Sequence, residues 1–374
     1  MVPNLRFNND PYKKYNLYEF ATRVTRKNKD NVSNLPLTIS AQYGLVDQVS
    51  FFNKTVASKD MSGYYLLKNG EFAYNKSYSN DYPWGAIKRL DLYDMGCLST
   101  LYICFKTNDN IVNSNYLVHY FESSKWHKQV ADIAGEGARN HGLLNIGVND
   151  FFNTKHAVPT IENQIKIAGF LDLIEKRIQT QIKIIDDYNS LKMGIYNCMF
   201  KENYADYKLK QLAYIVKGDQ INNDQLLSNG SYYMMNGGAS PSGYLDSYNV
   251  SENTISISEG GNSCGYVQFN SSPFWSGGHC YTIQNVNSAL IENKYLYHYL
   301  KYKEKEIMNL RIGTGLPNIQ KKDLENFTIL VPSLLIQRKN LALFEMLDEK
   351  ISILNEELAN LQKQKKYLLC NMFI

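Results

Sequence analysis

The stretch VPTIENQIKIAGFLDLIEKRI runs from Val158 to Ile178, and a similar stretch, VPSLLIQRKNLALFEMLDEKI, runs from Val331 to Ile351. The two lie 173 residues apart, and the pairing continues without insertion or deletion over 43 positions. The same offset also pairs GLLNI, which ends at Ile146, with GLPNI, which ends at Ile319. A chain that repeats a segment of this length is built from two tandem units.

Each copy has the pattern of a long helix that packs against another helix. Thr160 and Ser333 each follow a proline, and their side chains can cap the first free N–H groups of a helix. Beyond them, apolar residues recur at alternating steps of three and four, which predicts a coiled-coil seam. Both copies have a lysine at the same seam position, Lys192 and Lys365, where a polar residue fixes the register. The expected interface residues are Leu171, Ile174, Ile178, Ile185 and Ile195 in the first copy and Leu347, Ile351, Leu354, Leu358 and Leu361 in the second.

A chain of 374 residues is longer than a single-core domain typically is. The repeat divides it into four parts. We predict a globular domain at 1–157, a long helix at 158–202, a second globular domain at 203–330 and a second long helix at 331–374. A globular segment separates the helices, so they can pack antiparallel; the alternative is an amphipathic helix on each domain's own surface. The predicted fold class is α+β: two mixed α/β domains and two long antiparallel coiled-coil helices, in a pseudo-two-fold tandem repeat.

Composition is that of a folded protein, with 44% hydrophobic and 20% charged residues. No apolar run reaches the roughly 20 residues of a membrane helix. The N-terminal residues lack the apolar core of a signal peptide, so the sequence predicts a cytoplasmic location. The six cysteines form no CxxC pair and have no zinc-like spacing to histidine, which predicts neither a disulfide nor a metal site.

Positive charge is concentrated near the N-terminus, although the net charge is only +4. Six lysines and arginines lie between Lys13 and Lys29, against one acid, Glu19. This is expected where phosphates lie nearby, and a solvated basic face is the alternative.

The segments between the helices share their edges but differ in length and in their middle sequence, which indicates two readers of different targets. Asparagine and arginine can contact base edges, while serine, lysine and backbone N–H groups hold phosphates. The loops that begin at Gly135 and Arg311, just before each repeated helix unit, both offer an arginine and glycines; a tight turn is the alternative for them. The candidate DNA-binding residues are Asn75, Lys76, Ser77, Tyr78, Lys88, Arg89, Arg139, Asn140, His141, Asn236, Ser240, Ser242, Tyr244, Asn262, Ser263, Arg311 and Thr314.

Three features carry a resemblance to a known family: the paired GLLNI and GLPNI units, each followed by VP and a helix with a glutamine; LRF near the N-terminus; and YNKSYSNDYPWGAIKRLDLYDMGCLSTLY from Tyr74 to Tyr102. With them the chain resembles the specificity subunits of type I restriction-modification enzymes over nearly its whole length. The resemblance implies that the two globular domains are target-recognition domains, each reading one half of a gapped asymmetric site in double-stranded DNA. It also implies that the helices space these domains and dock partner subunits.

In that family the specificity subunit has no catalytic residues and no cofactor or metal of its own. Two modification subunits bind S-adenosylmethionine and methylate adenine, and restriction subunits use ATP and Mg for translocation and cleavage. The string closest to an adenine methyltransferase motif, Asn9-Asp10-Pro11-Tyr12, has Asp10 where the first proline is needed, and there is no Walker A lysine motif. Two other classes stay open: a coiled-coil scaffold that binds only proteins, and a single-chain DNA adenine methyltransferase.

Overall fold

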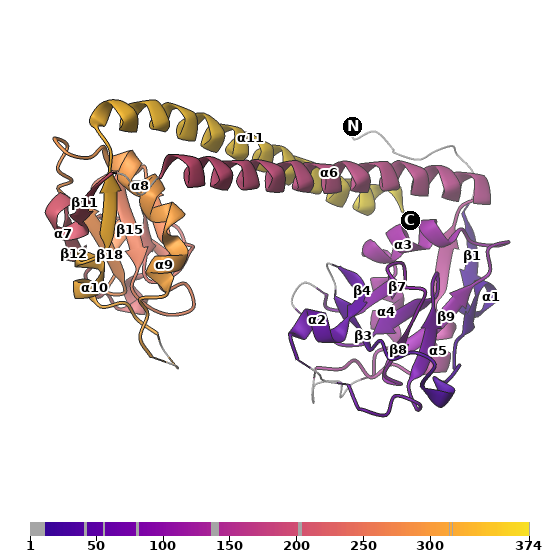
Figure 1. The fold of residues 1–374 in the computed structure, drawn as a ribbon. Helices are drawn as coiled ribbons and strands as arrows, with labels where there is room; N and C mark the ends of the chain where they lie inside the picture. Colours follow the sequence, from indigo (N-terminus) through magenta and orange to yellow (C-terminus); the bar gives the residue numbers. More distant parts are fainter. Residues whose placement is uncertain are drawn as a thin grey trace. The chain divides into compact units, whose positions relative to one another are not determined.

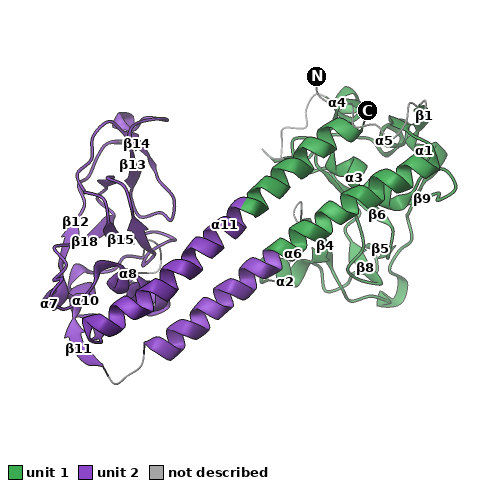
Figure 2. Cartoon of the chain, turned by 90° about the horizontal axis from the view of Figure 1, so that it is seen from above, with its two compact units in different colours: residues 1–181, 357–374 green, residues 182–356 purple. Residues whose placement is uncertain are grey.

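A computed structural model of the chain describes residues 12–40, 43–54, 57–79, 82–135, 142–200, 204–313, 315 and 317–373. It divides into two compact units (Figure 2). Unit 1 contains residues 1–181 and 357–374, and unit 2 contains residues 182–356. Each unit therefore takes one part of each long helix.

Unit 1 is built around a four-stranded antiparallel sheet with the order β2-β9-β6-β7. Figure 1 labels its strands β7 and β9. Three further antiparallel pairs, β1-β10, β3-β4 and β5-β8, complete its strands. The strands are β1 (Lys13–Asn16), β2 (Ala21–Arg23), β3 (Leu37–Ser40), β4 (Gly44–Asp47), β5 (Tyr65–Lys68), β6 (Phe72–Asn75), β7 (Ala86–Arg89), β8 (Met95–Leu98), β9 (Ile103–Thr107) and β10 (Lys155–Val158). The helices are α1 (Leu17–Phe20), α2 (Gln48–Phe52), α3 (Ser114–Glu122), α4 (His127–Ile133), α5 (Val148–Phe152) and the first part of α6 (Ile161–Met199).

Unit 2 contains a four-stranded antiparallel sheet with the order β12-β18-β15-β16. A strand pair, β11-β19, and a smaller sheet, β14-β13-β17, accompany it. The strands are β11 (Ala205–Lys208), β12 (Tyr214–Lys217), β13 (Tyr232–Met235), β14 (Gly243–Leu245), β15 (Thr254–Ser258), β16 (Val267–Asn270), β17 (Trp275–Ser276), β18 (Cys280–Gln284) and β19 (Thr328–Val331). The helices are α7 (Leu209–Leu212), α8 (Asn293–Tyr302), α9 (Glu304–Met308), α10 (Lys321–Glu325) and the first part of α11 (Leu334–Met372).

The two units share one frame. In each, a strand pair immediately precedes the long helix, and a shorter helix packs on the edge strand of the four-stranded sheet: α3 on β7, and α8 on β16. These shorter helices also repeat a sequence, SNYLVHYFE in α3 and NKYLYHYLKY in α8, which aligns Tyr116 with Tyr295 and His119 with His298. The mixed α/β units and the two long helices confirm the predicted fold class.

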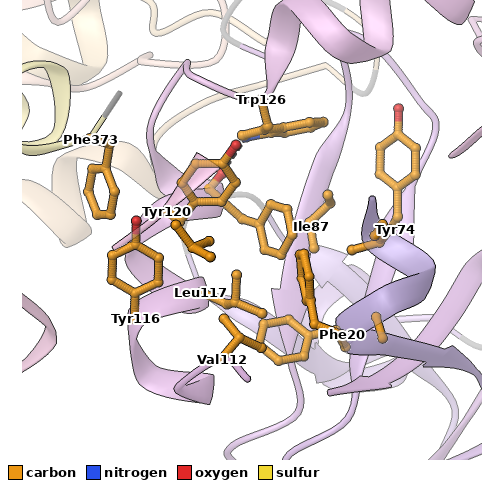
Figure 3. Packing of buried hydrophobic residues seen from close by; sticks show 14 of the residues in the cluster. Phe20, Tyr74, Ile87, Val112, Tyr116, Leu117, Tyr120, Trp126 and Phe373 are labelled. Atoms are coloured by element: carbon orange, nitrogen blue, oxygen red, sulfur yellow. Dashed lines mark hydrogen bonds between the residues drawn. The ribbon is translucent and has the colours of Figure 1, made fainter. Parts of the chain in front are cut away.

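The core of unit 1 is rich in aromatic side chains (Figure 3). Tyr74 stacks on Phe151 with ring centroids 4.9 Å apart and meets Trp126 edge to face at 5.9 Å. Phe373, which follows α11, packs on Tyr116 at 5.3 Å and is 2% exposed. The end of the second long helix is therefore part of the core of unit 1.

The core of unit 2 has a matching contribution from the first long helix. Tyr196, near the end of α6, packs edge to face on Phe344 of α11 with ring centroids 4.8 Å apart. Its hydroxyl is 2.8 Å from Nδ1 of His298 in α8. Phe200, just beyond α6, lies 5.1 Å from Tyr299. Each long helix thus ends in the core of the unit that it does not begin in.

Within unit 1, α6 and α11 pack antiparallel. Lys365 Nζ donates to Glu175 Oε2 at 2.6 Å, and Gln181 Nε2 donates to Glu357 Oε2 at 3.1 Å. As residue numbers increase along α6, the numbers of their partners in α11 decrease, which is the pattern of antiparallel helices. Lys365 is one of the two seam lysines, and its partner in unit 1 is an acid of the other helix.

Unit 2 has the same arrangement, since Lys192 of α6 forms an ion pair with Asp348 of α11. Lys192 and Asp348 are the repeat equivalents of Lys365 and Glu175. Among the ten expected interface residues, the structure buries Leu171, Ile178, Ile185, Leu347, Leu354 and Leu361, and leaves Ile174, Ile195, Ile351 and Leu358 partly exposed.

A buried glutamine joins each long helix to its globular part. Gln164 Oε1 accepts from the backbone N–H of Asn113 at 2.7 Å, and its Nε2 donates to Pro159 O at 2.8 Å. In unit 2, Gln337 Oε1 accepts from the backbone N–H of Glu292 at 2.8 Å. Both glutamines are 1% exposed or less, so these bonds have little competition from water.

In the part of the chain that the structure describes, no helix is both long enough and apolar enough to cross a bilayer. Among the same residues, no three His, Cys, Asp or Glu side chains come together as a metal site would require.

Candidate nucleic-acid interface

In unit 1, the segment that follows β6 lies beside the loop that precedes α5. Leu144 N–H donates to Lys76 O at 2.9 Å, and Tyr78 N–H donates to Gly142 O at 3.0 Å. Gly142 has φ +70°, which glycine adopts without strain. The structure therefore places the candidates Asn75 to Tyr78 beside the described end of the glycine loop.

The side chains at this place, which we call the unit 1 joint (75–78 with 142–144), are polar and partly exposed. Asn75 Oδ1 accepts from the backbone N–H of Ser77 at 3.0 Å, so this amide shapes the turn. Lys76 Nζ donates to Ile146 O at 3.5 Å. Ser77 is exposed, and Tyr78 is 45% exposed. The joint thus presents a cation, a hydroxyl and an aromatic ring beside a glycine loop.

Lys88 and Arg89 lie on β7, and their charges are paired inside unit 1. Lys88 forms an ion pair with Glu122, and its side chain is 11% exposed. Arg89 Nε is 2.6 Å from Asp91 Oδ1, and another guanidinium nitrogen donates to Ser114 Oγ at 2.8 Å. These contacts hold both side chains against α3 and the segment that follows β7. Their contact with DNA stays a prediction.

Unit 2 contains an equivalent joint between the segment after β15 and the loop before α10. Ile319 N–H donates to Glu259 O at 2.8 Å, and Gly261 N–H donates to Pro317 O at 3.1 Å. The loop residues belong to GLPNI, the repeat partner of GLLNI. We call this place the unit 2 joint (259–261 with 317–319). The repeated loops therefore make the same kind of backbone connection in both units.

A cavity of about 630 Å³ opens at the unit 2 joint. Four of the DNA-binding candidates line it, and they come from two loops, the one between β13 and β14 and the one between β15 and β16. Its walls are otherwise four glycines, a histidine, a proline and an asparagine. The lining residues are Asn236, Gly237, Gly238, Ser242, Gly260, Gly261, Asn262, Ser263, His279, Pro317 and Asn318.

The remaining candidates in unit 2 lie outside this lining. Ser240 is exposed in the loop between β13 and β14, and Tyr244 of β14 is 37% exposed. Arg311 is exposed in the loop that follows α9. Four candidates, Arg139, Asn140, His141 and Thr314, lie outside the described residues.

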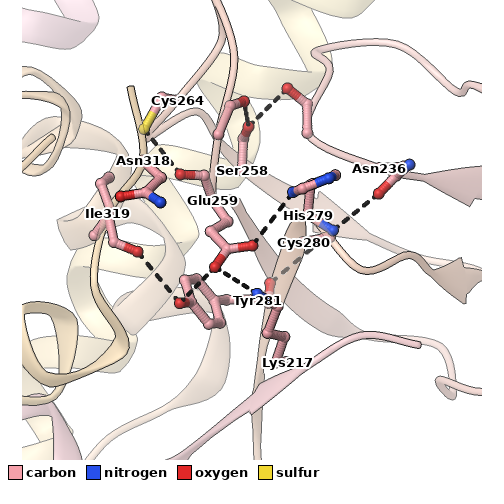
Figure 4. Close-up of polar contacts among 12 residues, drawn as sticks. Lys217, Asn236, Ser258, Glu259, Cys264, His279, Cys280, Tyr281, Asn318 and Ile319 are labelled. Carbon is pink, nitrogen blue, oxygen red and sulfur yellow. Dashed lines mark hydrogen bonds and ion pairs between the residues drawn. The ribbon is translucent and has the colours of Figure 1, made fainter. Parts of the chain in front are cut away.

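A polar network lies under the cavity (Figure 4). Glu259 Oε1 accepts from Lys217 Nζ at 2.7 Å and from the Tyr281 hydroxyl at 3.0 Å. Burial, followed by the neighbouring Glu259 carboxylate, raises the pKa of Tyr281 well above its ordinary value of 10.0. The phenol therefore keeps its proton and acts as a donor to the carboxylate.

Comparison with known proteins connects this arrangement to one family. A model of the type I restriction modification DNA specificity domain matches residues 201–363. The chain is 34% identical over 155 residues to a putative type I specificity subunit of Mycoplasma pneumoniae, and 32% identical over 127 residues to one of Mycoplasma genitalium. A crystal structure of a type I restriction-modification S subunit from M. genitalium aligns over 100% of this chain and 99% of its own, at a TM-score of 0.63 and 18% identity.

Residues 201–363 thus match the type I restriction modification DNA specificity domain, and the chain is similar to type I specificity subunits. The two curated matches cover 41% and 34% of this chain, and 41% and 33% of the relatives' own lengths. A second solved structure, described as concerning complex assembly and conformational transition of the type I R-M system, covers 96% of each chain at a TM-score of 0.57 and 18% identity. At this identity the two solved structures establish the fold.

Sequence reasoning missed four polar residues in and beside the cavity: Lys217, Glu259, His279 and Asn318. The available signal was the string GGHC, in which His279 follows two glycines and directly precedes β18. A histidine at the start of a strand and beside a glycine turn is well placed for a surface role. The contacts of Glu259 had no local signal, because Lys217 and Tyr281 lie on other strands.

The long helices α6 and α11 carry exposed apolar side chains. Leu173 of α6 is 67% exposed, and Leu335 and Met346 of α11 are 81% and 58% exposed. Clustered apolar exposure often marks a protein contact, whereas single exposed apolar residues are ordinary.

Proposed function

We propose that this chain is a type I specificity subunit that reads double-stranded DNA with both units, one half of a gapped, asymmetric site in each, and performs no chemistry itself. In this proposal two modification subunits methylate adenine with S-adenosylmethionine. Restriction subunits then use ATP and Mg to translocate and cleave DNA. The long helices space the two readers and dock the modification subunits, in the cytoplasm.

The observation that carries the proposal is the joint that both units build from the repeated glycine loops. Each joint fixes a polar segment beside a loop by two backbone hydrogen bonds. The side chains differ: Asn75 to Tyr78 in unit 1, and the amide-lined cavity around Asn262 in unit 2. A common backbone frame with different side chains suits two readers of different sequences, because backbone contacts position a protein on DNA and side chains select the bases.

The chemistry of the two joints supports a division of roles. An asparagine amide offers a donor and an acceptor side by side, as the adenine edge requires, and the exposed Asn262 suits this role. Lys76 and Arg311 offer cations suited to phosphates. The exposed apolar residues of α6 and α11 suit contacts with modification subunits, since protein contacts commonly have an apolar centre.

Sequencing of methylated bases in the host genome tests the proposal. Deletion of the gene for this chain should abolish methylation of one gapped adenine motif, and restoring the gene should restore it. A chain in which unit 2 is replaced by the second domain of another specificity subunit should change one half of the motif and keep the other. An unchanged methylation pattern after deletion would contradict the proposal and favour the protein-binding scaffold.

A further inference from the structure

Glu259 has one carboxylate oxygen that receives no hydrogen bond from the described residues. The residue follows β15 and is 7% exposed. Its Oε1 accepts from Lys217 and Tyr281. Its Oε2 is buried and has no hydrogen bond within the described part of the chain, and His279 Nδ1 lies 3.6 Å from it. A buried carboxylate oxygen without a hydrogen-bond donor lowers the stability of the fold. The position of Glu259 beside His279 therefore calls for a functional explanation.

His279 is held by its backbone while its ring remains accessible. Its N–H donates to Asn236 Oδ1 at 2.9 Å, and its carbonyl accepts from Glu259 N–H at 2.9 Å. The side chain is 61% exposed and lines the cavity. Figure 4 shows the ring between the Glu259 carboxylate and the Asn236 amide. One ring nitrogen therefore faces the acid, and the other is available to a ligand.

Two glycines make this arrangement possible. A Cβ on Gly277 would lie 2.7 Å from Asn236 Oδ1, the atom that holds the His279 backbone. Gly237 has φ +79°, and a Cβ there would lie 3.2 Å from the Cβ of His279. Larger residues at either position would push the amide or the ring away.

The position of Glu259 bears on which ring nitrogen of His279 carries the proton. Lys217 Nζ lies 2.7 Å from Glu259 Oε1 and supplies the counter-charge of the carboxylate. A carboxylate oxygen accepts only, so a hydrogen bond that closes the 3.6 Å gap between Oε2 and Nδ1 requires the tautomer with its proton on Nδ1. The second nitrogen, Nε2, is then an acceptor.

We propose that His279 reads a base: its Nε2 accepts a hydrogen bond from the exocyclic amino group of an adenine or a cytosine in the major groove, and Glu259 is the positioning residue that sets the tautomer. This rests on the proposed function and names one contact within it. In the major groove only adenine and cytosine offer an amino donor, while guanine and thymine offer acceptors there. The cavity lining favours a base over a phosphate, because it has three asparagine amides that can pair with a base edge and no lysine or arginine to neutralise a phosphate.

The test uses the tagged full-length chain, isolated from its host with the subunits that it carries, and a library of random duplex DNA from which bound sequences are read. The wild type should select adenine or cytosine at one position in the half-site read by unit 2. H279A should reduce discrimination at that position about tenfold and leave the other positions unchanged. H127A, the same substitution in unit 1, is the matched control and should leave the unit 2 half-site as it is.

E259Q gives the sharper outcome. Its amide N–H group would donate to Nδ1, which moves the histidine proton to Nε2 and turns that nitrogen into a donor. The preferred base should then change from adenine or cytosine to guanine or thymine. Retention of the original preference in E259Q, or its loss without this exchange, would overturn the role of Glu259.

If E259Q destabilises unit 2, H279A still tests the inference, because the His279 side chain is exposed and its removal should leave the fold intact. A uniform loss of affinity in H279A would indicate a phosphate contact and overturn base reading, as would unchanged selection. A wild type that selects no sequence would overturn the proposed function as well. A wild type that selects a gapped site while H279A selects the same one would overturn this inference alone.

Discussion

At the scale of single residues, buried histidines make the two cores sensitive to acid. His298 is 2% exposed and bonded to the Tyr196 hydroxyl. Burial, followed by the charge of Lys192, lowers the pKa of His298 to about 3 from an ordinary value of 6.5. Burial lowers the pKa of His156 in unit 1 to about 4. Both imidazoles are therefore neutral in the folded protein at neutral pH.

The free energy of unfolding should fall as the pH drops below 6.5. In that range the unfolded chain binds a proton at His298 that the folded chain does not, down to a pH of about 3. The largest slope from this one group is about 1.4 kcal/mol per pH unit. Denaturant unfolding between neutral and acid pH should give a shallower slope for H298Q than for the wild type. Identical slopes would mean that His298 already takes up its proton in the folded state.

Single substitutions at the joints should separate phosphate contacts from base contacts. K76A should weaken binding to all duplexes alike and lower the salt slope of log affinity by about one unit. N262A should relax one base position in one half-site by about 1–3 kcal/mol, with the salt slope unchanged. K128A, at an exposed lysine away from the joint, is the control for charge. Equal effects of K76A and N262A on every sequence would contradict the division.

The sequence identified polar residues in loops as candidate contacts, but it did not show which residues would lie beside them in the fold. Asn236 and Asn262 were recognisable because they stand among glycines and serines, and the structure places both on one cavity. The polar seam position of Lys365 was also recognisable, but its partner Glu175 follows only from the packing of two helices. Glu259 and His279 were missed because strand pairing, and no local pattern, brings them together.

At the scale of elements, the glutamine after each Val-Pro pair connects a long helix to its globular part. In unit 2, Gln337 bonds to the backbone of Glu292, Leu290 and Pro332 at 2.8 to 2.9 Å. These groups lie at the start of α8 and at the end of β19. One side chain therefore fixes where two elements meet the helix.

Q337L should destabilise unit 2 by about 3 kcal/mol, because it leaves a buried backbone N–H and two carbonyls without their partner. Calorimetry or denaturant unfolding of the full chain should show the transition of unit 2 shifted and that of unit 1 retained. Q362L, the same change at an exposed position of α11, should be nearly neutral. A loss below 1 kcal/mol in Q337L would mean that water replaces the glutamine.

The sequence predicted helices whose apolar pattern repeats over many residues, and missed the relation between helices whose pattern covers only a few. The two helices of 39 residues follow from a seam of apolar steps that no strand would keep. The resemblance between α3 and α8 was missed, because each is short and consists largely of tyrosine and histidine. The order of the four-stranded sheets depends on long-range pairing, which composition does not encode.

At the scale of the whole molecule, the repeat predicts that half of the chain can pair with itself. Unit 1 uses Leu368, Leu369 and Met372 of α11, and Phe373 directly after it, in its core. Their repeat equivalents are Ile195, Tyr196, Met199 and Phe200, which a fragment of residues 1–200 contains. In a two-fold homodimer, Lys192 of one copy would meet Glu175 of the other and replace both cross-helix ion pairs.

A fragment of residues 1–200 should therefore be a dimer, with the mass measurable by light scattering. With modification subunits it should direct methylation to an inverted repeat of the unit 1 half-site. K192E should weaken the dimer by placing two acids together, and the added change E175K should restore it. A folded monomer, or methylation of the original asymmetric site, would contradict the two-unit interpretation.

The contribution of Phe373 to the core of unit 1 affects how the protein is made. A ribosome that has finished residues 1–200 must add more than 170 further residues before Phe373 exists. At about 5–20 residues per second, this takes on the order of 10–30 s. During that interval the apolar surface that α11 will cover is exposed to chaperones, proteases or a second nascent chain. A chain that terminates early and stays monomeric therefore exposes apolar core residues that chaperones and proteases bind.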